Sequence, residues 1–174
     1  MPRHATGLKR KPDPHATVVV FKVALTGDKT IWRRIAIRSD QTLDDLHAAI
    51  FDAYDRFDEH LYSFHLQPLY ARRGPDFNRG NVEYTSPVHI EEARSYAEHK
   101  IHDAAKTRIA DLSPQPGDKL YYLFDFGDSW WHELTVEQTD GKMQYGRAYP
   151  FIMEKHGVSP PQYPEPEEAE GFAE

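Results

Sequence analysis

The stretch from Lys119 to Gln138, KLYYLFDFGDSWWHELTVEQ, constrains the fold more than any other part of the chain. It is the densest aromatic run, and residues 125–129 interrupt it with Asp and Gly, which suit a tight turn. Both arms are rich in residue types that favour strands. The stretch therefore predicts a β-hairpin in which Gly127 can take positive φ and residues 119–126 form a central strand.

The second arm of this hairpin alternates between an apolar and a polar face, as a half-buried strand does. The face that we expect toward the core consists of Trp130, His132, Leu134 and Val136. The face that we expect toward solvent consists of Trp131, Glu133, Thr135 and Glu137.

The part of the chain before the hairpin predicts the elements on which the hairpin packs. Residues 18–25 and 31–38 alternate in hydrophobicity and predict two paired strands. Residues 42–54 have helical spacing, with Thr42 as the N-cap and two acidic residues in the first turn. A third strand is expected over residues 59–67. This order predicts the α+β class and a β-grasp-like ββαβ core, which the C-terminal hairpin extends.

Four segments carry a family pattern. Residues 122–137, YLFDFGDSWWHELTVE, fit Y-x-x-D-F-G-D-x-W-x-H, and residues 31–34 (IWRR), 59–61 (EHL) with Phe64, and 159–163 (SPPQY) agree. Together they resemble the plasmid pRiA4b ORF-3-like family over most of the chain. The resemblance implies no established activity and a link to plasmids and insertion sequences. Other members have a Cys near the end, which this chain lacks.

The chain of 174 residues suits one domain with a hydrophobic core. We expect a basic disordered tail at residues 1–14, a single domain at 15–164 and an acidic disordered tail at 165–174. Many relatives in the family are shorter over residues 69–102, which we interpret as a helical insertion. Its helix is expected to run from Pro87 to about Lys106.

Composition excludes several classes of function. A formal net charge of −7 argues against a general nucleic-acid binder. The chain has no Cys, so it has no disulfide or thiolate metal site, and we expect a cytoplasmic protein without membrane spans. It also lacks the G-x-S-x-G, P-loop, Rossmann glycine and H-E-x-x-H motifs. The resolvase-like label on family members has no matching catalytic domain or helix-turn-helix here.

The main candidate site consists of Asp125, Asp128 and His132, with His60 from the third strand. Two carboxylates and two imidazoles are groups that could hold a divalent metal or run acid–base catalysis. The alternative is structural: the two Asp residues cap the turn, and His132 forms a hydrogen bond with one of them.

A second candidate site consists of Trp32, Arg33 and Arg34, which could stack on and pair with an anionic or aromatic ligand. Alternatively, Trp32 packs under the arginine side chains, or Arg33 pairs with Asp125 or Asp128.

Two further groups are weaker candidates for function. A helical ligand set, for which a solvated polar face is the alternative, consists of Glu98, His99, His102 and Asp103. A basic and aromatic loop, which could touch a nucleic-acid backbone and for which a flexible surface loop is the alternative, consists of Tyr70, Arg72, Arg73, Phe77 and Arg79.

These observations favour a binding or interaction module over an enzyme, with an unknown protein or small ligand as the partner. The residues predicted to bind are Trp32, Arg33, Arg34, His60, Asp128, Trp130 and His132. We expect Asp128→Ala or His132→Ala to weaken capture of the partner while the fold survives. The alternative function is a metal-dependent hydrolase or nuclease that uses His60, Asp125, Asp128 and His132. No cofactor is expected otherwise, and nucleic-acid binding is a third hypothesis that the net charge disfavours.

Overall fold

The structure is a computed structural model and describes residues 11–67 and 82–165. The predicted tail residues 1–10 and 166–174 lie outside these ranges, as do the loop arginines Arg72, Arg73 and Arg79. The remaining elements form a mixed α+β fold, which confirms the predicted class.

The described residues form one eight-stranded sheet, with the spatial order β5-β4-β3-β6-β7-β1-β2-β8. Neighbouring strands are antiparallel, except that β4 and β5 are parallel. The strands are β1 (Val18–Leu25), β2 (Trp32–Arg38), β3 (Tyr62–His65), β4 (Val82–Thr85), β5 (Lys100–Asp103), β6 (Lys119–Phe124), β7 (Trp130–Gly141) and β8 (Phe151–His156).

The predicted hairpin is strands β6 and β7, and it lies inside the sheet. Strand β7 pairs with β1, and β6 pairs with β3, so the hairpin fills the space between the two halves of the ββαβ unit. Strand β1 consequently has antiparallel neighbours on both sides, β2 and β7. The coarse α+β prediction is confirmed, whereas the more specific β-grasp-like topology is not.

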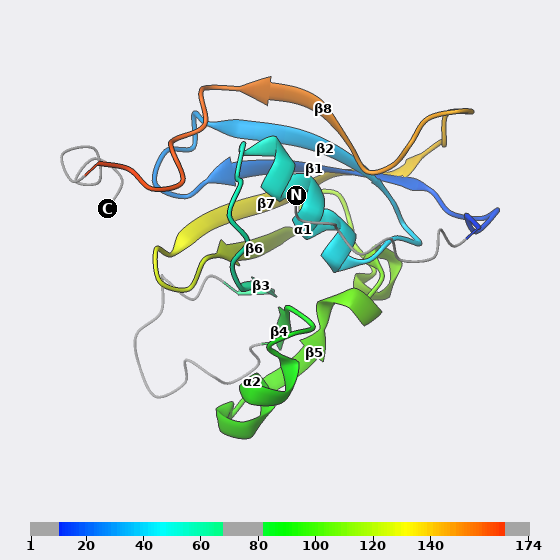
Figure 1. The fold of residues 1–174 in the computed structure, drawn as a ribbon. Helices are drawn as coiled ribbons and strands as arrows, with labels where there is room; N and C mark the ends of the chain where they lie inside the picture. Colours follow the sequence, from blue (N-terminus) through cyan, green and yellow to red (C-terminus); the bar gives the residue numbers. More distant parts are fainter. Residues whose placement is uncertain (1–10, 68–81, 166–174) are drawn as a thin grey trace.

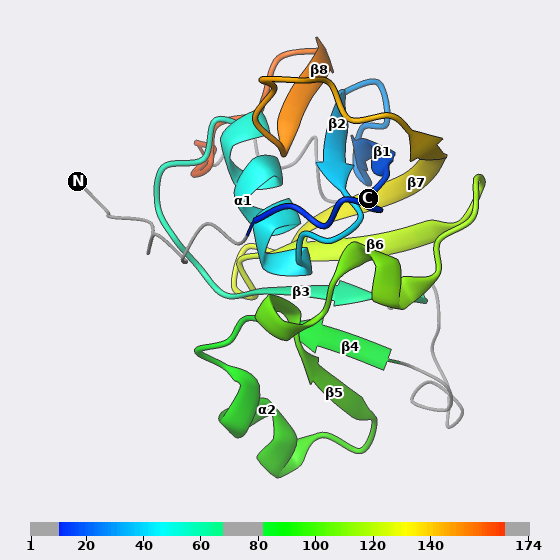
Figure 2. The same ribbon diagram turned by 90° about the vertical axis from the view of Figure 1, so that its right-hand side faces the viewer.

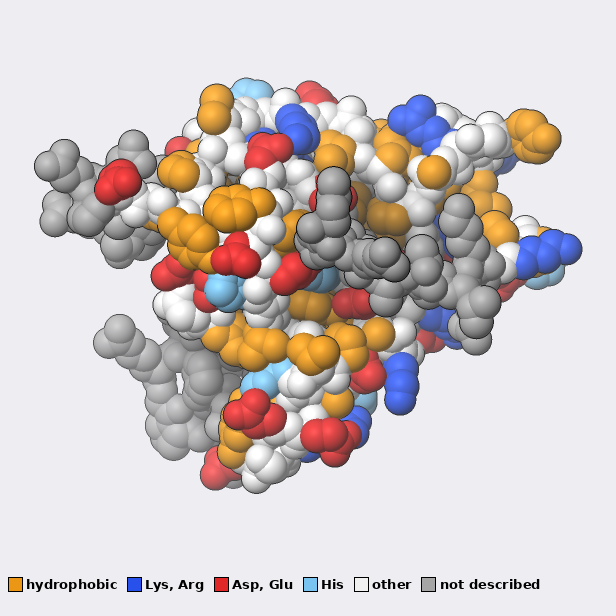
Figure 3. Space-filling view, viewed as in Figure 1, with side chains coloured by type: hydrophobic (Ala, Val, Ile, Leu, Met, Phe, Trp, Pro, Cys, Tyr) orange, Lys and Arg blue, Asp and Glu red, His pale blue; other side chains and the backbone are white. Residues whose placement is uncertain are grey.

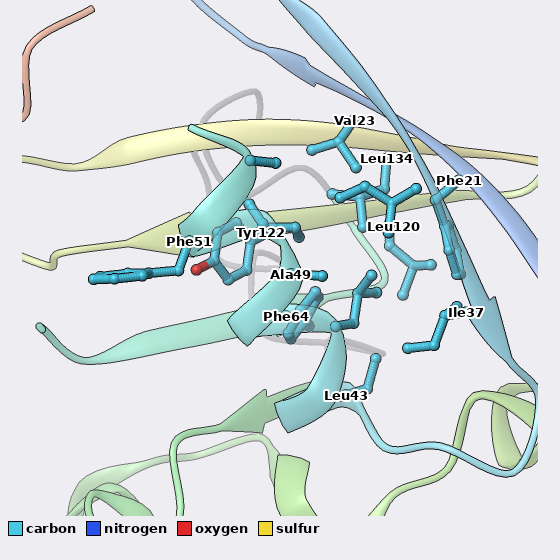
Figure 4. Close-up of a cluster of buried hydrophobic side chains, with 14 of the residues drawn as sticks. Phe21, Val23, Ile37, Leu43, Ala49, Phe51, Phe64, Leu120, Tyr122 and Leu134 are labelled. Carbon is cyan, nitrogen blue, oxygen red and sulfur yellow. The ribbon is translucent and has the colours of Figure 1, made fainter. Parts of the chain in front are cut away.

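Helix α1 (Leu43–Ala53) covers one face of the sheet, as Figures 1 and 2 show. Its start is the predicted one: the Thr42 hydroxyl accepts from the Asp45 backbone amide, and the Asp45 carboxylate accepts from the Thr42 amide. Leu43 and Ile50 of the helix meet side chains from β1, β2, β3, β6 and β7 in a single buried cluster. Figure 4 shows helix and strand side chains interlocking in this core.

The predicted long helix after Pro87 is wrong in its extent. Helix α2 spans only Ile90–Tyr96, and residues 100–103 form β5, which pairs in parallel with β4. Residues 100–103, which helical spacing alone assigned to a helix, thus form the edge strand of the sheet. Two 3-10 turns, Ala104–Lys106 and Ile109–Leu112, then lead back to the hairpin.

Candidate functional site

The turn between β6 and β7 is stabilised by the side chain of Asp125. One carboxylate oxygen accepts hydrogen bonds from the backbone amides of Gly127, at 3.0 Å, and Asp128, at 3.3 Å. Positive φ occurs at Asp125 (60°) and Ser129 (55°) and not at Gly127. Asp tolerates this conformation because its side chain can bond to the turn amides.

His60 lies next to this turn and joins it to the end of the described chain. Its Nε2 is 3.5 Å from the second carboxylate oxygen of Asp125 and 2.8 Å from the hydroxyl of Tyr163. The Tyr163 hydroxyl donates to the carboxylate of Asp58 at 2.7 Å. This hydrogen bond, with the charges of Asp58, Asp125 and Asp128, raises the pKa of Tyr163 to about 12.

Two aromatic rings next to these carboxylates face solvent. Phe57 is 67% exposed and Tyr163 is 47% exposed, and their rings meet edge to face at 5.9 Å. The buried side chain of Gln162, the residue before Tyr163, holds the backbone at Phe57 and Asp58, since its Oε1 accepts from their amides and its Nε2 donates to the Asp58 carbonyl. We call this region the turn surface; its residues are Phe57, Asp58, His60, Asp125, Asp128 and Tyr163.

On the face shown in Figure 3, acidic and histidine side chains lie beside exposed hydrophobic groups in the left half of the view. Lys and Arg side chains are more frequent in the right half. Asp58 and Asp128 are exposed, and Asp125 is buried against the turn. The turn surface therefore combines carboxylates with two exposed aromatic rings.

His132 is not part of the turn surface. It is 1% exposed and lies on the core side of β7, where its ring contacts the rings of Tyr54, at 4.9 Å, and Tyr122, at 5.1 Å. Burial, together with the positive charge of Arg56, lowers the pKa of His132 to about 3, so the ring is neutral near pH 7. Its Nδ1 lies 3.4 Å from the carbonyl of Tyr122, which makes that nitrogen the donor.

The second predicted site is divided between two faces of the sheet. Arg33 is 1% exposed and donates to the carbonyls of Ala53, Trp32 and His156 and to the hydroxyl of Ser159. It therefore does not pair with Asp125 or Asp128, and that prediction is wrong.

Trp32 and Arg34 lie on the outer face of the sheet. The Arg34 guanidinium and the Lys22 ammonium lie over the Trp32 ring, at 5.1 Å and 4.8 Å. Arg34 also pairs with Glu137 and Glu154. Thus the three residues of this candidate site do not share one surface.

The proposed helical ligand set is not helical. His99 follows α2 and pairs with Glu83 of β4 at 2.6 Å, and His102 of β5 stacks on Tyr84. Asp103 accepts from the amide of Ala105 at the start of a 3-10 turn. The predicted helical neighbours are therefore split between a connecting segment and a strand.

Of the predicted metal ligands, the structure brings together His60 and Asp125 but places His132 apart from them. Within residues 11–67 and 82–165, no three His, Asp or Glu side chains are grouped as a metal site would require. In the same ranges no helix is sufficiently long and apolar to span a membrane.

Sequence reasoning missed Phe57, Asp58 and Gln162, together with the buried Arg56. They lie just after α1 and near the chain end, where hydrophobic periodicity is absent. The only signal in the sequence is the SPPQY segment of the family pattern, which contains Gln162 and Tyr163.

The fold and the turn surface together define a small α+β domain with an open mixed sheet and an acidic, aromatic surface at one hairpin turn. The model of the family described as "Plasmid pRiA4b ORF-3-like protein" matches residues 17–172, and the chain belongs to this family.

One sequence relative and one solved structure match with partial coverage. The chain is 27% identical over 149 residues to uncharacterized protein y4hQ of Sinorhizobium fredii, which covers 84% of this chain and 66% of that protein. It therefore spans just under two thirds of that relative's length. A crystal structure of the protein of unknown function MM3350 from Methanosarcina mazei Go1 is similar with a TM-score of 0.60 and 23% identity, covering 80% of this chain and 70% of the other. That likeness concerns the fold.

Proposed function

We propose that this protein is a binding module whose turn surface recognises a cationic group, Lys or Arg, presented by a partner protein. The observation that supports it is the placement of the Phe57 and Tyr163 rings beside the carboxylates of Asp58 and Asp128. Exposed aromatic faces attract cations through their π electrons, and carboxylates pair with them through charge-assisted hydrogen bonds.

The turn surface is also held in place before a partner arrives. Gln162 bonds to the backbone at residues 57 and 58, and the Asp125 carboxylate orders the turn that carries Asp128. Preorganisation of this kind reduces the entropy cost of association.

The acidic character of the turn surface disfavours a nucleic-acid backbone as the partner, because phosphates and carboxylates repel each other. The link to mobile elements is a proposal that rests on the family description alone. The cytoplasm is likewise a proposed compartment, supported by a chain without cysteine.

The test is selection of a random peptide library displayed on phage against the purified full-length protein. We expect enriched peptides to carry Lys or Arg, and we expect synthetic copies to bind at least tenfold more weakly to Asp128→Asn. The matched control is Asp140→Asn, which removes the same charge from an exposed position at the far end of β7. Enrichment without basic residues, or equal binding by both variants, would refute the proposal.

The second candidate function is a metal-dependent hydrolase, favoured by the 3.5 Å approach of His60 Nε2 to Asp125. It ranks below binding because Asp125 already accepts two turn amides and His132 lies on the core side of β7. Elemental analysis and thermal unfolding with and without a chelator separate the two, because a bound metal stabilises the folded state by mass action.

A further inference from the structure

Arg56 occupies a buried position between the end of α1 and the hairpin. It follows Asp55, whose φ of 55° turns the chain inward, and it is 6% exposed. Its guanidinium lies 4.2 Å from the ring of Trp130, and its Nη1 donates to the carbonyl of Pro160 at 3.2 Å. The ring and the single carbonyl are neutral groups, so these two contacts do not neutralise its charge.

The other edge of this guanidinium is unpaired. Nε and Nη2 of Arg56 are both buried, and neither has a hydrogen-bond partner among the described residues. These two nitrogens form the edge with which arginine grips a carboxylate or phosphate through two parallel hydrogen bonds. The nearby carboxylate of Asp55 is engaged by Ser159, at 2.8 Å, and Lys155, at 3.4 Å.

Arg33 shows what the fold does for a buried arginine that has a purely structural role. It is even more buried than Arg56, at 1% exposed, but all three of its side-chain nitrogens donate to acceptors of the protein. Burying a charged group is unfavourable unless it is paired and hydrogen-bonded. Arg56 differs from Arg33 in this respect, because two of its donors have no acceptor among the described residues. An acceptor from outside these residues would satisfy them.

The neighbouring His132 has a second buried polar atom without a partner. Trp130 and His132 lie two residues apart on the same face of β7, so the histidine ring is close to the guanidinium that covers Trp130. Its Nε2 also has no hydrogen-bond partner among the described residues. Because Nδ1 of His132 carries the proton, this Nε2 can only accept, so the unused hydrogen-bonding capacity at this place consists of two donors on Arg56 and one acceptor on His132.

We propose that Arg56, Trp130 and His132 form a binding site for a small oxyanion, a carboxylate or a phosphate, which the Nε and Nη2 edge of Arg56 grips. The indole of Trp130 forms one wall, and His132 lies at the side. Because the two nitrogens are shielded from solvent, the oxyanion enters when the segment of residues 159–163 shifts away from Arg56.

The test is an NMR titration of the full-length protein with sodium acetate, sodium phosphate and sodium chloride at matched ionic strength. The reporter is the Nε–H resonance of Arg56, and the internal control is that of Arg33, whose Nε–H is bonded to the Ala53 carbonyl. We expect a saturable shift of the Arg56 signal with acetate or phosphate, a linear or absent shift with chloride, and a constant Arg33 signal. The more effective of the two oxyanions identifies the preferred ligand class.

A variant sharpens this test. Arg56→Lys keeps the positive charge but removes the two-nitrogen edge, and we expect at least tenfold weaker binding when the indole N–H resonance of Trp130 is followed. Arg34→Lys on the outer face serves as the matched control and should bind as the wild type does. Equal linear shifts with all three salts, or unchanged affinity in Arg56→Lys, would overturn the proposal. If Arg56→Lys does not fold, the wild-type titration with its Arg33 control decides.

Discussion

The two buried arginines, Arg33 and Arg56, lie in two regions of the interior that satisfy the guanidinium group in different ways. On the side of β2 and β8, Arg33 donates to three backbone carbonyls and a hydroxyl, and its guanidinium lies 4.7 Å from the Tyr54 ring. On the side of the hairpin, Arg56 has one carbonyl and the face of Trp130. The first region is complete in itself, whereas the second retains unpaired donors. Burial of an arginine alone therefore does not identify a structural role. The role is identified by whether the protein supplies hydrogen-bond acceptors for all of its side-chain nitrogens.

The largest expected effect comes from Arg33→Met. This change leaves three carbonyls and the Ser159 hydroxyl without their donor, so we expect a loss of about 3–5 kcal/mol in the free energy of unfolding. Urea denaturation followed by tryptophan fluorescence measures it. The matched control is Arg34→Met on the outer face, where partly exposed ion pairs make the loss about 1 kcal/mol or less. Similar losses in both variants would break the comparison.

A smaller effect is expected from pH. The pKa of His132 is about 3 in the folded protein, and that of an unfolded histidine is about 6.5. Below about pH 6.5 the unfolded chain binds a proton that the folded protein does not, so stability falls by about 1.4 kcal/mol per pH unit toward pH 3.

Between pH 7 and pH 5 this histidine should therefore cost about 2 kcal/mol, before most carboxylates titrate. His132→Phe should remove that slope, and His102→Phe, at an exposed position, should retain it. Stability is measured by urea denaturation at each pH. Parallel pH profiles for the wild type and His132→Phe would show that His132 is not the neutral group of the hairpin region.

Tyr54 links the two regions, because its ring contacts both Arg33 and His132. Its hydroxyl donates to the carbonyls of Val23, at 2.8 Å, and Ile31, at 3.3 Å. Tyr54→Phe keeps the ring and removes these bonds, so we expect a loss of about 1.5 kcal/mol by thermal or urea unfolding. An unchanged free energy of unfolding would show that the hydrogen bonds of the Tyr54 hydroxyl do not stabilise the fold.

The smallest effect is expected from Arg56→Met. The variant loses the bond to Pro160 and the contact with Trp130, but it also removes a buried charge with two unpaired donors, so stability should change by about 1 kcal/mol or less. Unfolding is measured in chloride buffer without acetate or phosphate. A loss as large as that of Arg33→Met would erase the difference between the two arginines.

Local patterns predicted the elements well. The alternation of residues 18–25, the helical spacing after Thr42 and the aromatic hairpin at 119–138 all correspond to observed elements. Each depends on a short period of hydrophobic residues, which the sequence displays directly. The hairpin turn was also placed correctly, and its positive φ angles occur at Asp125 and Ser129 and not at Gly127.

Long-range pairing was not predictable in this way. Residues 100–103 form a strand because they pair with β4, and the spacing of their hydrophobic residues does not predict this pairing. Arg33 was grouped with Trp32 and Arg34 in one candidate site, and its observed partners were not predicted, because they are mainly backbone carbonyls without a sequence signature. The turn surface was predicted in part, through His60, Asp125 and Asp128. Its aromatic half was missed because Phe57 and Tyr163 belong to irregular segments.

The position of the hairpin inside the sheet has a consequence for how the chain assembles during synthesis. Strands β1 to β3 emerge first, yet β1 and β3 each have to wait for a neighbour that lies more than fifty residues further along the chain. Until β6 and β7 arrive, the helix and the first two strands have no continuous surface on which to bury their apolar side chains. Such non-local pairing slows folding and lengthens the exposure of unpaired edges, so the nascent chain should depend on chaperones until about residue 141 has left the ribosome.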